Sequence, residues 1–129
     1  VDFNNGDAVV DLGYTDLTTP RKVKDGLSKT GMVCEKRIRL GTGPGAAYDD
    51  RGWSDGWDLD TVKSTFCQPR SDSEDAVNDS LTAGSRHVSG FHTVFADGAV
   101  HFINYNIDLE TWNRVGHRAD GELLDLDAL

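Results

Sequence analysis

Five Asn-Gly or Asp-Gly pairs divide this chain into short segments, and they constrain the fold more than any other feature of the sequence. Asn, Asp and Gly tolerate positive φ, so these pairs favour tight turns. The intervals between them suit short strands. The pairs are Asn5-Gly6, Asp25-Gly26, Asp55-Gly56, Asp97-Gly98 and Asp120-Gly121.

The pair Asp97-Gly98 lies between two apolar runs in the segment 91–104. A two-residue type I′ turn at this pair predicts a hairpin with strands near 91–96 and 99–104 and a positive φ at Gly98. In that register Phe95 faces Val100, and the alternation of side chains defines two faces. One face holds Phe91, Phe95, Val100 and Phe102, and the other holds His92, Val94, His101 and Ile103.

Both faces of this hairpin carry large apolar groups, so we expect a sheet that is covered on both sides. The face with Phe91 and Phe102 has the larger side chains and should be buried. An exposed apolar patch of this size would cost stability, so a partner chain, a second copy or a local helix should cover it.

Further elements follow from local patterns. Residues 8–12 and 31–40 resemble strands, the second with Met32 and Cys34 on one face and Glu35 on the other. Residues 41–58 and 68–85 are rich in turn formers and predict long loops. Asp108 can cap a short helix over 109–115, with Trp112 pointing inward and Gly116 ending the helix in the left-handed conformation.

Length and charge limit the classes of protein. A chain of 129 residues predicts one domain, and a net charge of -9 disfavours nucleic acid and anionic lipid as partners. No apolar stretch reaches the roughly 18 residues of a membrane helix, and Val1 does not begin a signal peptide, so we expect any targeting segment to be absent from this chain.

The cysteines and histidines leave alternatives open. Cys34 and Cys67 either form one disulfide, if the protein is exported, or remain two buried thiols. His92 and His101 fall on one face of the predicted hairpin, but two imidazoles do not make a metal site and no spacing supplies a third ligand. We therefore expect structural histidines.

A loop rich in Asp and Trp, at 48–60, offers oxygen ligands for calcium and aromatic faces for glycans. The spacing does not match an EF-hand, so a solvated surface is the alternative. The candidate calcium ligands are Asp49, Asp50, Asp55, Asp58 and Asp60, accompanied by Trp53 and Trp57.

The sequence contains none of the catalytic motifs considered below. The glycine-rich segment 41–45 lacks the Gly-Lys-Ser/Thr ending of a phosphate loop, and Pro44 removes an amide donor. Neither a Gly-x-Ser-x-Gly elbow nor a His-Glu-x-x-His helix is present. The sequence therefore predicts a protein that is not an enzyme.

Ser85-Arg86-His87, nine residues and Asp97-Gly98 together resemble the prepilin-type processing-associated H-X9-DG family, pilin-like proteins of unknown function that are abundant in planctomycete bacteria. The block 85–122 resembles the family throughout, and residues 23–35 extend the likeness. Ser89 and Cys34 depart from its usual residues. The further matching segments are Phe95-Ala96-Asp97-Gly98-Ala99-Val100, Ile107-Asp108, Thr111-Trp112 and Gly121-Glu122.

The resemblance implies an α+β, β-rich fold: the antiparallel sheet of a type IV pilin-like head, without the N-terminal pilin helix. It implies a fragment, processed form or truncated version of a longer protein, with a structural or assembly role at the cell surface or envelope. It supplies no catalytic residues. His87, Asp97 and Gly98 are then structural, Asp97 in the turn and His87 bonded to a loop carbonyl or carboxylate.

Overall fold

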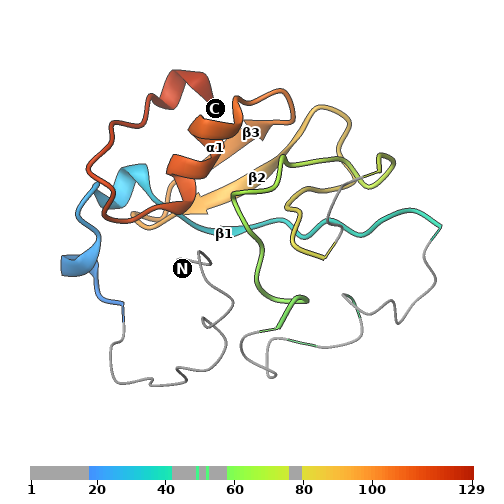
Figure 1. The fold of residues 1–129 in the computed structure, drawn as a ribbon, viewed down its shortest axis with the longest axis horizontal. Helices are drawn as coiled ribbons and strands as arrows, with labels where there is room; N and C mark the ends of the chain where they lie inside the picture. Colours follow the sequence, from blue (N-terminus) through green and yellow to red (C-terminus); the bar gives the residue numbers. More distant parts are fainter. Residues whose placement is uncertain (1–17, 42–48, 50–51, 53–57, 76–79) are drawn as a thin grey trace.

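The computed structural model describes residues 18–41, 49, 52, 58–75 and 80–129, and within them the chain forms a small α+β fold (Figure 1). Strands β1 (Gly31–Cys34), β2 (Gly90–Phe95) and β3 (Val100–Asn104) make an antiparallel sheet of order β1-β2-β3. Helix α1 (Leu109–Gly116) follows the sheet. The described residues also include the short 3-10 helices η1 (Pro20–Lys22), η2 (Leu27–Lys29) and η4 (Leu126–Ala128). The expected antiparallel α+β fold is confirmed.

Two further expectations concern a strand at 8–12 and a membrane helix. The strand predicted at 8–12 lies outside the described residues. Among the described residues, no helix has the length and apolar character of a membrane span.

The hairpin is present, but its turn differs from the predicted one. The amide of Gly98 donates to the carbonyl of Phe95 at 2.9 Å, and the amide of Phe95 donates to Ala99 at 2.8 Å. Gly98 has φ 90, whereas no described non-glycine residue has positive φ, which excludes a type I′ turn at Asp97. The loop therefore has three residues, as in a type I turn that ends in a left-handed glycine.

This extra loop residue shifts the register by one. Val94 pairs with Val100 and His92 with Phe102. Because side chains alternate, a shift of one residue moves every side chain of a strand to the other face. Our assignment of β3 is therefore wrong: Val100 and Phe102 are 61% and 43% exposed, while Ile103 is fully buried with Phe91 and Phe95. His92 and His101 likewise lie on opposite faces.

The chain's own helix packs on the buried face of the sheet. The ring of Phe91 stacks on Tyr105 at a centroid distance of 5.9 Å and meets Trp112 of α1 edge-on at 5.4 Å. Val115 of α1 approaches Gly31 so closely that a Cβ there would lie 2.7 Å from its Cγ1 atom. Of the three covers expected for Phe91 and Phe95, the local helix is the one present.

Helix α1 begins as predicted and ends differently. The amide of Thr111 donates to the Asp108 side chain at 3.0 Å, which is the expected N-cap bond. Gly116 belongs to the helix and lacks positive φ, so its predicted left-handed role is wrong. A Cβ at Gly116 would lie 2.3 Å from Oγ1 of Thr65, so close packing is what requires glycine there.

Strand β1 is shorter than predicted because the chain leaves the sheet after Cys34. Lys36 forms an isolated bridge with Ala83, and the amide of Leu40 donates to Asp72 at 2.8 Å. Fully buried Arg37 donates to the carbonyl of Ser71 at 3.0 Å. Residues 36–40 therefore pair with the loop 68–85, which holds no helix or strand in its described part.

Candidate metal centre

The sheet face opposite α1, here called the outer face, carries exposed apolar side chains and a cluster of polar ones. Val33 of β1 pairs with Val94 of β2, which pairs with Val100 of β3, so the three share this face. Val33 is 57% exposed. Phe102 also lies on the outer face. Within the described residues, the chain covers the face under α1 but leaves Val33, Val100 and Phe102 exposed.

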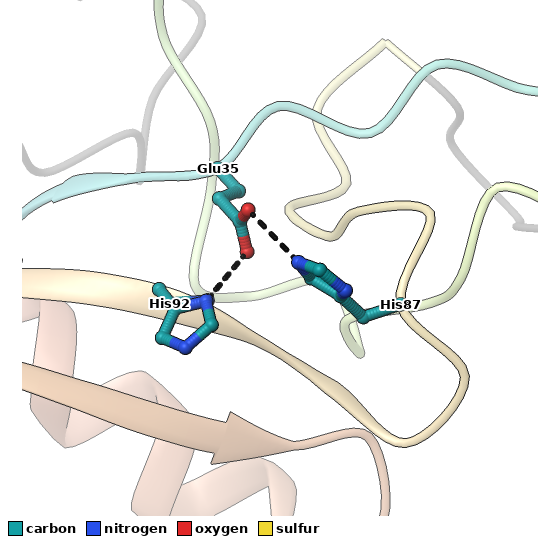
Figure 2. Close-up of side chains that lie close together, drawn as sticks. All are labelled: Glu35, His87 and His92. Atoms are coloured by element: carbon teal, nitrogen blue, oxygen red, sulfur yellow. Dashed lines mark hydrogen bonds and ion pairs between the residues drawn. The ribbon is translucent and has the colours of Figure 1, made fainter.

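Glu35, His87 and His92 meet at one end of the outer face (Figure 2). Nε2 of His87 lies 3.4 Å from Oε1 of Glu35, and Nδ1 of His92 lies 3.3 Å from Oε2. The two imidazole rings stand edge to face with centroids 5.6 Å apart. Each side chain offers one ligand atom, and these atoms all lie within 4.8 Å of one another.

The pairing of β1 with β2 positions Glu35 and His92. The amide of Glu35 donates to the carbonyl of His92 at 3.1 Å, and the amide of His92 donates to Oε2 of Glu35 at 2.7 Å. The His92 ring also meets Phe102 edge-on at 5.3 Å. The carboxylate is therefore held by backbone as well as by the imidazoles.

A tight loop between Ser85 and β2 positions His87. The hydroxyl of Ser85 accepts from the His87 amide at 3.1 Å and donates to Gly90 at 3.1 Å. The Ser85 amide donates to the buried hydroxyl of Tyr105 at 2.9 Å. A Cβ at Gly90 would lie 2.1 Å from the carbonyl oxygen of Ile103, so only glycine permits this approach.

Sequence reasoning singled out His87 and His92 but not Glu35. His87 lies near a carboxylate, and Asp97 and Gly98 form the turn, with Oδ1 of Asp97 accepting from the Ala99 amide at 2.9 Å. His92 was matched with His101 instead of His87. Glu35 could not be recognised as a member from the sequence, because only the pairing of β1 with β2 brings it near His92, which is 57 positions away.

Two of the three described aspartates proposed for calcium lie near a lysine. Nζ of Lys36 lies 2.7 Å from Asp49 and 3.8 Å from buried Asp60. Oδ1 of Asp58 accepts from the Asp60 amide at 3.0 Å. An ammonium group thus supplies positive charge between two of these carboxylates. The rest of the set, Asp50, Asp55, Trp53 and Trp57, lies outside the described residues.

Cys34 and Cys67 are free thiols, and both are partly buried rather than fully buried. Burial raises the pKa of Cys34 to about 11, and nearby Lys63 lowers it by less. Burial also raises the pKa of Cys67, opposed by a hydrogen bond with Thr82. Both groups are therefore protonated thiols near neutral pH.

The chain is similar to one family of proteins. A family model described as a protein of unknown function (DUF1559) matches residues 4–110, which is more than half of the chain. No curated protein and no solved structure matches.

Proposed function

This chain belongs to the DUF1559 family of proteins of unknown function, and on that premise we propose that it is a non-enzymatic structural or assembly domain. In this proposal, copies of the chain associate through the sheet. The observation that carries the proposal is the outer face, where Val33, Val100 and Phe102 remain exposed although the chain buries the opposite face of the same strands. Clustered exposed apolar groups of this kind mark interaction surfaces.

The edge of the sheet supports the same role. Strand β3 is last in the order β1-β2-β3, so its outer side has no strand partner among the described residues. Natural proteins protect such edges with lysine, other charged residues or proline. The sequence of β3, Val-His-Phe-Ile-Asn, contains none of these. An unprotected edge beside an apolar face favours pairing with another polypeptide.

The finer parts of the proposal come from the resemblance to H-X9-DG proteins. The His87-to-Gly98 motif supports a pilin-like head in a surface or pseudopilin-type apparatus of a bacterium, by resemblance a planctomycete. An extracellular or envelope location accords with this role. The alternative, a calcium- or glycan-binding module at 48–60, has weaker support because Lys36 lies between Asp49 and Asp60.

Sedimentation velocity over rising protein concentration tests self-association. We expect the natural sequence to form larger species as its concentration rises, and Val100→Glu to remain monomeric, because a charge on the outer face opposes burial there. Leu123→Glu is the matched control, since Leu123 is 88% exposed and lies outside the sheet. It should associate like the natural sequence.

Equal association of the natural chain and Val100→Glu would contradict the proposed surface. A natural chain that stays monomeric at every concentration would contradict self-association altogether. Thermal unfolding of both variants shows whether they are folded. Because Val100 and Leu123 are mostly exposed, neither substitution should lower the melting temperature much.

A further inference from the structure

We propose that Glu35, His87 and His92 form a binding site for a divalent transition-metal ion, of which zinc is the representative. Among the described residues, these three side chains lie close enough together to bind one metal ion. Two imidazoles and one carboxylate favour zinc and its neighbours in the first transition row, whereas calcium and magnesium prefer an all-oxygen environment.

The distances agree with those of a zinc centre. Bonds of 2.0–2.2 Å in a tetrahedral arrangement place neighbouring ligand atoms about 3.3–3.6 Å apart. Nε2 of His87 lies 3.4 Å from Oε1 of Glu35, and Nδ1 of His92 lies 3.3 Å from Oε2. One ligand atom from each side chain lies within 4.8 Å of the other two, so one ion can bind all three once the side chains rotate toward a common point.

The backbone holds the ligands in place before any ion binds. The carboxylate of Glu35 accepts a hydrogen bond from the His92 amide. The His87 amide donates to the hydroxyl of Ser85, whose own amide donates to the buried hydroxyl of Tyr105. Such preorganisation reduces the entropy lost on binding. The side chains are also accessible, with exposed fractions of 57% for His87, 49% for His92 and 36% for Glu35. The net charge of -9 further attracts cations.

The two ends of the His-X9-Asp-Gly motif both contribute to this site. His87 is a ligand. Asp97 and Gly98 form the three-residue turn that fixes the register of β2 with β3, and β2 carries His92. Three protein ligands leave at least one coordination position for water or for a group from another molecule. This inference stands on the cluster alone and does not depend on the proposed assembly role.

Isothermal titration of the tag-free chain with zinc chloride tests the site. We expect one ion per chain and at least about tenfold weaker binding for His87→Ala, His92→Ala and Glu35→Gln, since each removes one of three ligands. His117→Ala is the control histidine, because its ring lies by Phe66 and outside the cluster. The pair Cys34→Ser and Cys67→Ser controls for zinc bound by thiols.

Cobalt absorption and melting curves separate the loss of a ligand from a failure of the variant to fold. The visible absorption of bound cobalt reports its coordination, and we expect this spectrum to weaken and change shape in Glu35→Gln, which keeps the size of the side chain. Melting curves with a chelator should be alike for the natural chain and Glu35→Gln. Zinc binding that is absent, that persists unchanged in His87→Ala, or that follows the cysteines would overturn the proposal.

Discussion

Single polar residues hold the loops of this domain to its sheet. Arg37 is fully buried, and its guanidinium donates to the carbonyls of Ser71 and Glu74. Buried charges are tolerated in proteins when they have such partners. Lys29 similarly donates to the carbonyl of Leu124 at 2.9 Å. In the described residues, such side-chain bonds to the backbone add to the backbone hydrogen bonds that hold the segments outside the strands.

Cys34 gives a prediction on pH. Its pKa rises to about 11 in the folded protein from an ordinary value of 9.0, because burial disfavours the thiolate. Above the lower value the unfolded chain loses this proton first, so the unfolded state binds fewer protons and the free energy of unfolding falls as pH rises. We expect this loss between about pH 9 and 11, measured by urea denaturation.

Cys34→Ser provides the comparison, because it lacks the thiol but keeps the lysines and tyrosines that also titrate in this range. The natural chain should lose more stability over the range than the variant. Identical losses would show that Cys34 ionises equally readily in the folded and unfolded states.

At the scale of elements, the hairpin and helix α1 depend on local sequence, and their partners depend on the tertiary fold. The turn at 96–98 and the Asp108 cap are both made by residues within a few positions of one another. By contrast, Gly31, Gly90 and Gly116 are required by approaches to Val115, Ile103 and Thr65, which come from other parts of the chain.

The turn itself can be tested at Gly98. Its φ of 90 is unfavourable for a branched side chain, while nothing lies within 4 Å of a Cβ added there. Gly98→Val should therefore destabilise the protein by about 1–2 kcal/mol through backbone strain alone. Gly98→Asn should cost less, because Asn tolerates positive φ. Chemical denaturation measures both, and equal costs would count against strain as the cause.

At the scale of the whole molecule, the described residues pack on one face of the sheet and leave the other face exposed. The core joins β2, β3, α1 and the C-terminal segment through residues such as Phe91, Ile103, Trp112 and Leu124. The outer face brings together the exposed apolar side chains and the Glu35, His87 and His92 cluster. Both the proposed association and the proposed metal site therefore lie on the face that the described residues leave exposed.

Calcium should have little effect on the stability of this domain. The Lys36 ammonium lies between Asp49 and Asp60, so a calcium ion there would have to displace it. We expect the same melting temperature in millimolar calcium and in a calcium-selective chelator, because a ligand stabilises only through preferential binding to the native state. A rise that disappears in Asp50→Asn or Asp55→Asn would instead support the calcium loop.

The sequence by itself determined the hairpin near Asp97-Gly98, the short capped helix with Trp112 inward, and the loop in the described part of 68–85, because each depends on neighbouring residues. Only the tertiary structure decided the register of β3. Whether the turn of the hairpin holds two or three residues depends on the φ of Asp97. One additional turn residue exchanges the buried and exposed faces of β3. The tertiary structure also decided the cluster, since Glu35 and His92 meet only through the pairing of β1 with β2.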